Sequence, residues 1–473
     1  MDTKSYFCRM QHQGDTIVAI STPPGVGALG VIRLSGADAI SIVDQVSLKN
    51  LLETAGHSLV YTQIRGEHQE ILDDVLISIF KGPRSFTRDD TVEISCHGSP
   101  YILREMVALL VRKGARLARP GEFTQRAFLH GGMDLAQAEA VADLIAAQSA
   151  GAHQLAIDQL RGGVSRELKE LREQLLNFTS LIELELDFSE EDVEFADRSQ
   201  LMELIIHMQT RLRSLIDSFR VGNALKQGVP TVILGKPNAG KSTLLNALLQ
   251  DNRAIVSDIP GTTRDVIEDR IILGGVEFRL MDTAGVRETS DQIEAEGVSR
   301  SLALAQKAQM VLYVFDATAE TVAEGREYLL GLDLPKDTHV VLLANKLDLL
   351  PDEKAWVQAH DPADMPLGWQ WFGISAKDVV HLQALRDWMV EAVTWRETGT
   401  GDQAIISNLR HREALEAAAA SLDEVQQGMD AGISGDLLSI DIRTVLHHIG
   451  EITGEISTDE VLGNIFGKFC IGK

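Results

Sequence analysis

Apolar and polar residues alternate in short runs between residues 15 and 130, with turn-forming clusters between the runs. The runs are TIVAI (16–20), GVIRLSG (30–36), DVLISIF (74–80) and TVEISCHG (91–98). A period of two is typical of β-strands that bury one face, and one stretch of helical period, 101–114, lies among them. This part of the chain is predicted to form an α+β domain.

From residue 135 the pattern changes to the helical period. Residues 136–160 and 165–188 are predicted to form long helices, and 411–428 and 436–452 resume that pattern near the end of the chain. Between them, from Gly228-Val229-Pro230 onward, apolar strands alternate with helical segments, which indicates a mostly parallel sheet. The simplest topology packs helices 135–220 against helices 405–473 as one bundle, with an α/β domain inserted.

These changes of pattern divide the chain into segments. We expect an N-terminal domain over 1–130, a helical domain in two parts over 131–226 and 395–473, and an inserted α/β domain over 227–394. The predicted fold class is therefore multidomain α+β.

Composition limits the classes of partner. The chain of 473 residues has 69 acidic and 44 basic residues, a net charge of −25. Sequence-independent nucleic-acid binding depends on Lys and Arg that neutralise phosphates, so an RNA substrate would need a local basic patch or a more basic partner. Three cysteines, far apart, make no disulfide framework, and no apolar run is long enough to span a membrane. A reducing cytoplasm is the expected location.

Residues 235–242 read GKPNAGKS, a complete phosphate-binding loop. The loop follows a predicted strand, and Lys241-Ser242-Thr243 opens an apolar helix, which is the context this motif requires. Glycines let backbone N–H groups approach phosphates at the helix N-terminus. Lys241 would reach the β- and γ-phosphates, and Ser242 would ligate Mg²⁺.

Three further motifs follow in order. Asp282-Thr283-Ala284-Gly285 ends a predicted strand, where its carboxylate can hold the magnesium shell. In Asn345-Lys346-Leu347-Asp348, the Asp348 carboxylate can accept from both N1–H and the 2-amino group of guanine, a pair that adenine lacks. Ser375-Ala376-Lys377 would support the base. Together the four motifs predict a GTPase domain.

The residues alone leave the hydrolytic groups open. Val286 stands where Ras-like enzymes carry the water-positioning glutamine. The acids that follow it are candidates for that role: Glu288, Asp291, Glu294 and Glu296. Positive charge for the transition state could come from Arg264 or Arg287, or from a monovalent cation held by Asn238 and the oxygens of 257–263.

With these motifs in place, the chain resembles the MnmE (TrmE) family of tRNA-modification GTPases. GKPNAGKS, IPGTTRD (259–265), DTAG, NKLD and a terminal CIGK carry the resemblance, as do 22–36, 84–98, 118–147 and 451–473. The resemblance covers essentially the whole chain. It implies a folate-binding-like N-terminal α+β domain, an α-helical bundle domain and an inserted α/β P-loop GTPase domain.

The resemblance also implies roles for individual residues. It makes Glu294 the catalytic glutamate, and Cys470 a cysteine of the modification chemistry. Potassium would be bound by Asn238, Ser257, Ile259 and Thr262, magnesium by Ser242 and Thr263, and folate by Arg33, Glu93 and Lys473. The expected GTP-binding residues are Asn238, Ala239, Gly240, Lys241, Ser242, Thr243, Ser257, Thr262, Thr263, Asp282, Thr283, Ala284, Gly285, Asn345, Lys346, Asp348, Ser375, Ala376 and Lys377. One departure stands out: Gly132 occupies a position where the family usually has lysine.

Family members place an aminomethyl or carboxymethylaminomethyl group on C5 of the tRNA wobble uridine. The resemblance therefore implies GTP, Mg²⁺, K⁺ and a 5,10-methylene or formyl tetrahydrofolate as cofactors, with FAD only through the partner flavoprotein MnmG. It implies a homodimer, a heterotetramer with MnmG, and tRNA as substrate, with no membrane or DNA partner.

Two other functions compete with this one. A ribosome-assembly GTPase could have a similar G domain but usually carries a basic RNA-binding module, whereas residues 396–473 hold 13 acids and six bases. A stand-alone folate enzyme with a regulatory G domain would turn over folate unaided.

Overall fold

The structure, a computed structural model, describes residues 15–187, 197–250, 268–281, 303–360, 365–394 and 404–472. The chain divides into two compact units. The first draws on residues 1–145, 158–213 and 413–473, and the second on 146–157 and 214–412. The fold is multidomain α+β, as the sequence predicts.

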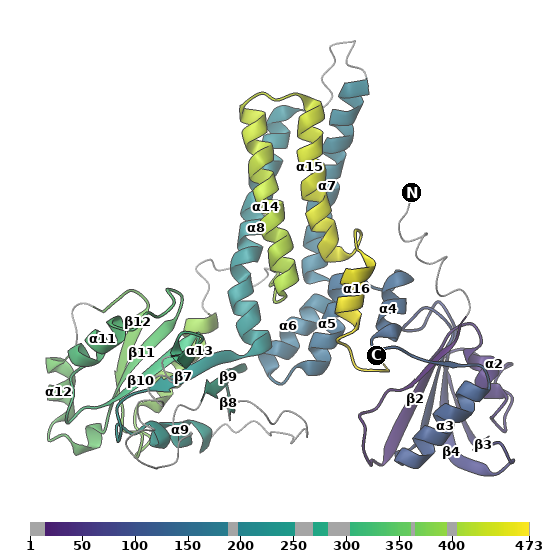
Figure 1. The fold of residues 1–473 in the computed structure, drawn as a ribbon, viewed down its shortest axis with the longest axis horizontal. Helices are drawn as coiled ribbons and strands as arrows, with labels where there is room; N and C mark the ends of the chain where they lie inside the picture. The colour runs from purple at the N-terminus through teal and green to yellow at the C-terminus, as the bar shows by residue number, and fades with distance from the viewer. Residues whose placement is uncertain are drawn as a thin grey trace. The chain divides into compact units, whose positions relative to one another are not determined.

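The first unit contains a sheet of six strands (purple and blue in Figure 1). Its strands are β1 (Ile17–Ile20), β2 (Leu29–Ser35), β3 (Ser58–Arg65), β4 (Ile71–Phe80), β5 (Thr91–His97) and β6 (Arg116–Leu117). Their order is β3-β4-β5-β2-β1-β6, and all neighbours are antiparallel except β1 and β6. The four strands predicted from alternation are confirmed as β1, β2, β4 and β5, while β3 was not predicted.

Helices α2 (Ala39–Asp44) and α3 (Pro100–Arg112) share a hydrophobic core with this sheet. Alternate residues of β2, Ile32 and Leu34, are buried together with Met106 and Leu110 of α3. The intervening residue Arg33 is only partly covered, so its side chain remains accessible on the sheet.

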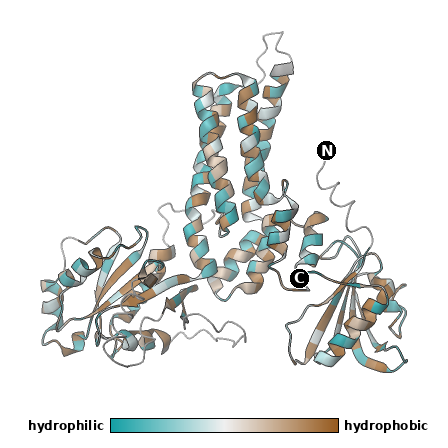
Figure 2. Ribbon diagram, viewed as in Figure 1, coloured by the Kyte–Doolittle hydropathy of each residue, from teal (hydrophilic) through white to brown (hydrophobic). Residues whose placement is uncertain are grey.

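Long helices make up most of the remaining first unit, and α6, α8 and α14 also contribute residues to the second. They are α4 (Glu122–Leu129), α5 (Leu135–Ala146), α6 (Ala150–Leu160), α7 (Gly163–Asp187), α8 (Arg198–Gln227), α14 (Leu409–Asp430), α15 (Gly435–Thr453) and α16 (Asp459–Phe466). Polar pairs join helices from the two ends of the chain. Arg443 of α15 donates to Glu183 of α7 at 3.0 Å, and Gln209 of α8 donates to Asp423 of α14 at 2.7 Å. Within the first unit, helices of 158–213 therefore pack against helices of 413–472, as predicted for these parts of the chain. Polar and apolar residues are interleaved along these helices (Figure 2).

The prediction of one helix over 136–160 is wrong, because the chain breaks between α5 and α6. Ser149 lies just before α6, and its hydroxyl accepts a hydrogen bond from the Ala152 N–H at 3.2 Å. A serine at this position caps a new helix in place of continuing the old one.

The second unit is built on a six-stranded sheet (teal and green in Figure 1). Its strands are β7 (Val229–Leu234), β8 (Glu268–Leu273), β9 (Val276–Met281), β10 (Met310–Asp316), β11 (His339–Asn345) and β12 (Trp369–Gly373). The order is β12-β11-β10-β7-β9-β8, and only β8 runs antiparallel to its neighbour. Its helical segments are α9 (Lys241–Gln250), α11 (Val322–Leu330), the 3-10 turn η1 (Leu347–Leu349), α12 (Glu353–Ala359) and α13 (Leu382–Thr394).

Both faces of this sheet are buried. Along β10, Leu312 and Val314 belong to one core cluster, while Val311, Tyr313 and Phe315 belong to the other. A parallel strand covered on both faces reads as a continuous apolar run, which explains the sequence MVLYVF. Within the described ranges, no helix has the length and apolar composition of a membrane span.

Candidate functional site

The carboxyl edge of the second sheet brings together nucleotide-binding motifs that are far apart in the sequence. Strand β7 ends immediately before 235–240, β11 ends within 345–348, and β12 ends at Gly373, one residue short of 375–377. Carboxyl ends of parallel strands meet at one edge of a sheet, where open α/β folds bind their ligands. The described parts of the predicted nucleotide site therefore lie at one place in the fold.

The phosphate loop depends on glycine at two points. Gly235 has φ of +146° and lies against the Val314 carbonyl, and Gly240 has φ of +101° and lies against the Asn345 side chain. A Cβ atom at either position would collide with these neighbours. Asn238 also has positive φ, +62°, a conformation that asparagine tolerates better than most residues. The side chains of Asn238 and Ser242 are exposed, and each carries an oxygen atom, the ligand type that Mg²⁺ and K⁺ prefer.

Lys241 is held inside this loop. Its Nζ atom donates to the carbonyl oxygens of Gly235 at 2.7 Å and Lys236 at 2.8 Å. Burial lowers the pKa of the Lys241 ammonium group. The two loop carbonyls thus hold the Lys241 ammonium group in the loop, and a bound phosphate would take their place as its hydrogen-bond acceptor.

Asn345 joins two of the motifs to each other. Its buried side-chain amide donates to the Ala239 carbonyl at 2.9 Å, and its oxygen accepts from the Ala376 N–H at 3.0 Å. One side chain therefore fixes the phosphate loop against the segment expected to support the base.

Asp348 is exposed, and one of its carboxylate oxygens accepts a hydrogen bond from the Ser375 hydroxyl at 2.7 Å. Ser375 is buried and also accepts from the Asp378 N–H at 3.2 Å. The serine hydroxyl orients the Asp348 carboxylate, which remains exposed and accessible to a nucleotide base. Lys377, next along the chain, is exposed.

Sequence reasoning missed the acids that hold two lysines of this site. Lys346 forms an ion pair with Asp316 at 2.6 Å, and Lys236 forms one with Glu320 at 2.8 Å. Burial would raise the pKa of Asp316, but hydrogen bonds from Lys346 and Thr318 lower it. Asp316 ends β10, and this position at the carboxyl edge is the only sequence signal that pointed to it.

Several predicted site residues lie outside the described residues. They are Ser257, Ile259, Thr262, Thr263, Asp282, Thr283, Ala284, Gly285, Glu294 and Lys473. The alternatives considered for hydrolysis, Arg264, Arg287, Glu288, Asp291 and Glu296, lie there too. Within the described part of the chain, no group of three or more His, Cys, Asp or Glu side chains could hold a metal ion.

Arg33 and Glu93 form a second group, in the first unit. They face each other across β2 and β5, and Arg33 Nε donates to Glu93 Oε1 at 2.8 Å. The guanidinium also lies 5.7 Å from the ring centres of Phe86 and Phe123. Sequence reasoning missed both aromatic residues, because their approach to Arg33 depends on the tertiary fold.

The end of the chain reaches this arginine. The carbonyl of Gly472 accepts from Ser21 Oγ at 3.2 Å and lies 3.5 Å from Arg33 Nη1. Gly472 has φ of +95° and lies against the Ile20 carbonyl, so only glycine fits there. Cys470, two residues earlier, is exposed. The structure therefore brings the described part of the tail to Arg33.

Apolar contacts anchor the tail before it reaches Arg33. Phe466 and Phe469 pack in one core cluster with Phe128 of α4, and the ring centres of Phe466 and Phe469 are 5.6 Å apart. Gly121, which precedes α4, has φ of +66° and lies directly against the Phe466 backbone. The tail thus packs on α4 through aromatic side chains.

Gly132, the departure from the family pattern, has a cation beside it. A Cβ atom at this position would lie 3.2 Å from Arg88 Nε. Arg88 is exposed and has φ of +66° in a loop whose Thr87 carbonyl is hydrogen-bonded to His130 at 2.7 Å. The lysine expected near here is absent, but an arginine lies against the same turn.

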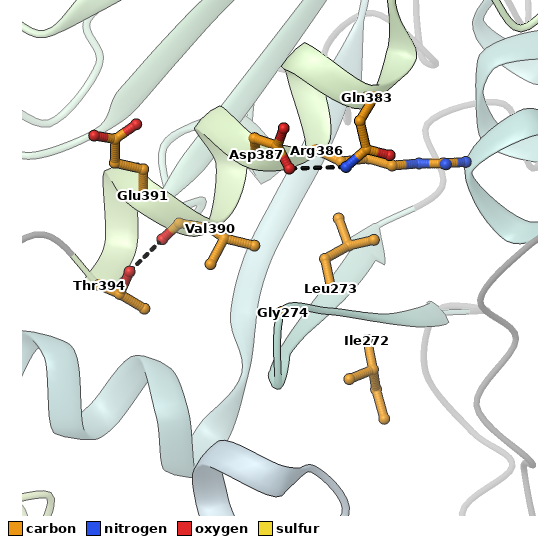
Figure 3. Close-up of a pocket in the computed structure, with 9 residues that line it drawn as sticks. All are labelled: Ile272, Leu273, Gly274, Gln383, Arg386, Asp387, Val390, Glu391 and Thr394. Atoms are coloured by element: carbon orange, nitrogen blue, oxygen red, sulfur yellow. Dashed lines mark hydrogen bonds between the residues drawn. The ribbon is translucent and has the colours of Figure 1, made fainter.

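A pocket of about 560 Å³ lies elsewhere in the second unit (Figure 3). It is lined by the β8–β9 hairpin and α13, with the side chains of Asp387 and Glu391 at its edge. Because β9 runs parallel to β7, the start of β9 lies at the amino edge of the sheet, away from the nucleotide motifs. None of the predicted site residues lines this pocket.

Comparisons with known proteins agree with the motifs. The model of the MnmE helical domain matches residues 135–470, and the model described as GTP-binding protein TrmE N-terminus matches residues 16–132. Three relatives carry the name tRNA modification GTPase MnmE. The Cytophaga hutchinsonii protein is 50% identical, over 97% of this chain and 98% of its own length. Those of Christiangramia forsetii and Parabacteroides distasonis are 48% and 49% identical, over 97% of this chain and 99% and 100% of theirs.

The family models and the relatives together span nearly the whole chain, and they agree with the motifs gathered at the carboxyl edge of the second sheet. The chain belongs to the MnmE family of tRNA modification GTPases.

Proposed function

We propose that this GTPase works with a flavoprotein partner, MnmG, to modify C5 of the wobble uridine in tRNA. The added group is aminomethyl or carboxymethylaminomethyl, and a folate supplies its one-carbon unit. The observation that carries the proposal is the contact of the C-terminal tail with Arg33, in a chain whose relatives are named tRNA modification GTPases. Those names favour tRNA modification over ribosome assembly.

In the nucleotide site, Asp348 would recognise guanine, and Lys241 would bind the β- and γ-phosphates. Ser242 would ligate Mg²⁺ together with Thr263. The exposed oxygen of Asn238 would ligate K⁺ together with Ser257, Ile259 and Thr262, and K⁺ would supply the positive charge that other GTPases take from an arginine. Glu294 would position the attacking water. The oxygen-rich, exposed donors at Asn238 and Ser242 support these assignments.

In the one-carbon site, Arg33, Glu93 and Lys473 would bind the folate, and Cys470 would take part in the modification chemistry. Support comes from the placement of Gly472 beside Arg33, because Cys470 precedes Gly472 by two residues and Lys473 follows it in the sequence. Phe86, which is 39% exposed, adds aromatic surface on which a flat ring system can stack, and the buried Phe123 lies against the Arg33 guanidinium.

The proposed organisation keeps the segments predicted from sequence: a folate-binding and dimerising domain over 1–130, a helical domain over 131–226 and 395–473, and a GTPase domain over 227–394. We propose a homodimer that joins MnmG in a heterotetramer in the cytoplasm. The net charge of −25 supports a division of labour in which MnmG holds most of the tRNA.

Reconstitution tests this proposal. The chain would be mixed with purified flavoprotein, unmodified tRNA, methylene-tetrahydrofolate, GTP and KCl, and the modified nucleoside would be measured by mass spectrometry. We expect product only with all components, and a large loss when NaCl replaces KCl. Equal product without GTP, or folate consumption by the chain alone, would contradict the proposal.

A further inference from the structure

The last residue of β10, Asp316, and Glu320 in the loop that follows are two acids that each bind a lysine of the proposed nucleotide site. Asp316 binds Lys346 of the base-recognition motif at 2.6 Å, and Glu320 binds Lys236 of the phosphate loop at 2.8 Å. Glu320 is the more buried of the two acids: its side chain is 5% exposed, against 25% for Asp316.

Glu320 is fixed from inside the protein. Its Oε1 atom accepts a hydrogen bond from the Tyr313 hydroxyl at 2.8 Å, and Tyr313 is 1% exposed within β10. The Tyr313 ring stacks on Tyr328 with centres 5.2 Å apart, and Gly325 of α11 packs against its edge. Burial, together with the hydrogen bond to Glu320, raises the pKa of Tyr313.

Lys236 is the accessible partner of the pair, with its side chain 67% exposed. Its hydrogen bond with Glu320 raises the Lys236 pKa, so this lysine stays charged at neutral pH. Glu320 is nearly buried, so its carboxylate would be left without a cation if the Lys236 side chain moved away.

The same lysine also contacts the phosphate-binding cation through its backbone. The Lys236 carbonyl accepts from Lys241 Nζ at 2.8 Å, beside the Gly235 carbonyl at 2.7 Å. Its side chain binds Glu320 while its backbone binds Lys241. A chain of contacts therefore runs from the buried Tyr313 through Glu320 and Lys236 to Lys241.

We propose that Glu320 is a positioning residue for the phosphate loop, acting through Lys236 to hold the loop in its binding conformation before nucleotide arrives. The inference rests on the proposed nucleotide site. Without the Glu320 contact, nucleotide binding must also order the start of the phosphate loop. The entropy cost of that ordering weakens the affinity for nucleotide. Once phosphates fill the loop they hold it themselves, so the rate of the bound enzyme changes little.

The test measures affinity for a fluorescent N-methylanthraniloyl GDP and steady-state GTP hydrolysis by the full chain. For Glu320→Gln we expect the dissociation constant to rise about tenfold, equivalent to about 1.4 kcal/mol. KM should rise in parallel, with kcat within about twofold of the parent. Unchanged affinity, or a fall in kcat with KM unchanged, would overturn the inference.

A double-mutant cycle separates positioning from a general structural effect. Lys236→Met changes an exposed side chain but leaves the Glu320 carboxylate without its cation, so urea unfolding first checks that the variant is folded. Its affinity for nucleotide should fall as much as that of Glu320→Gln. The double variant should add no further loss, and Lys236→Arg should lose less than Lys236→Met because it keeps the charge. Additive losses would overturn the inference.

Glu327→Gln is the matched control, since Glu327 is exposed on α11, the helix that follows this loop. It should leave affinity unchanged, and an equal loss there would overturn the inference. The parent chain tests the proposed nucleotide site separately. If the parent does not bind guanine nucleotide, the proposed site is wrong. If the parent and Glu320→Gln bind it equally tightly, only the role of Glu320 is wrong.

Discussion

The side-chain amide of Asn345 donates a hydrogen bond of 2.9 Å to the carbonyl oxygen of Ala239, 106 positions earlier in the chain. The same side chain accepts from the Ala376 N–H at 3.0 Å. Three segments of the proposed nucleotide site are thereby joined through one buried amide. The segments proposed to bind the base and the phosphates are therefore in contact through this side chain before any ligand is bound.

Asn345→Ala should weaken nucleotide binding and destabilise the second unit. The change leaves the Ala239 carbonyl and the Ala376 N–H without their partner, and each unsatisfied buried group costs about 1–3 kcal/mol. All five tryptophans fall between residues 356 and 395, so fluorescence-monitored urea unfolding reports on this unit. Asn246→Ala, on an exposed site of α9, is the control and should change stability by less than about 0.5 kcal/mol. Equal effects of the two variants would contradict the coupling role.

Asp348→Asn should change the base that the site accepts. In the proposed site the carboxylate would accept from two guanine N–H groups, whereas an amide presents one acceptor and one donor. We expect GTP affinity to fall about 100-fold, because a hydrogen-bonding pair to a charged group is lost. Xanthosine triphosphate, which carries a carbonyl oxygen at position 2, should be bound better by the variant than by the parent. Competition binding measures both, and an unchanged preference for GTP would contradict base recognition by Asp348.

Glu122→Gln should lower the stability of the first unit in a pH-dependent manner. Burial would raise the pKa of Glu122, but hydrogen bonds from Arg116 and from the Arg119 N–H hold it at about 2. A carboxyl whose pKa is lowered on folding contributes stability above its unfolded pKa and loses it as pH falls towards the folded value. The contribution at pH 7 should be roughly 3 kcal/mol, of which about 1.4 kcal/mol is lost by pH 3.5.

Amide hydrogen exchange in β1, β2 and α4 measures this effect, because no tryptophan lies in the first unit. The difference between parent and Glu122→Gln should stay constant from pH 7 to about pH 5 and shrink below about pH 4.5. Glu105→Gln, on an exposed site of α3, is the control. A difference that grows as the pH falls would show that the sign is wrong.

Gly472→Ala should abolish modification and leave GTP hydrolysis intact. Gly472 has φ of +95°, and a Cβ atom would strike the Ile20 carbonyl, so alanine displaces the tail from Ser21 and Arg33. Gly463→Ala is the control, because this glycine lies in α16 with open space around it, where alanine favours the helix. Reconstituted modification and GTP turnover should be measured for both variants. Full modification by Gly472→Ala would contradict a role for the seated tail.

Part of the site was predictable because each of its motifs is a continuous stretch of sequence. The phosphate loop, for example, is a local strand–loop–helix in which Gly235 and Gly240 are required by backbone conformation, so its sequence carries its structure. The parallel sheet was predictable because β10 and its neighbours are continuous apolar runs.

Contacts between distant residues were not predictable in this way. Arg33 and Gly472 are 439 positions apart, and nothing local to either residue indicates the other. The Lys236–Glu320 pair likewise depends on how β10 lies beside β7. The end of one helix and the start of the next near Ser149 were not predicted, because residues on both sides favour helix. The interruption is marked by a single hydrogen bond, from the Ala152 N–H to the Ser149 hydroxyl.

The most direct test of tRNA modification is nucleoside mass spectrometry on bulk tRNA from cells that lack this chain. Complementation would use the intact chain and a Cys470→Ser variant, with Cys96→Ser as the control, since Cys96 is a buried core residue. We expect loss of the C5-modified wobble uridines, restored by the intact chain and by Cys96→Ser but not by Cys470→Ser. Unchanged wobble nucleosides in cells lacking the chain would contradict it.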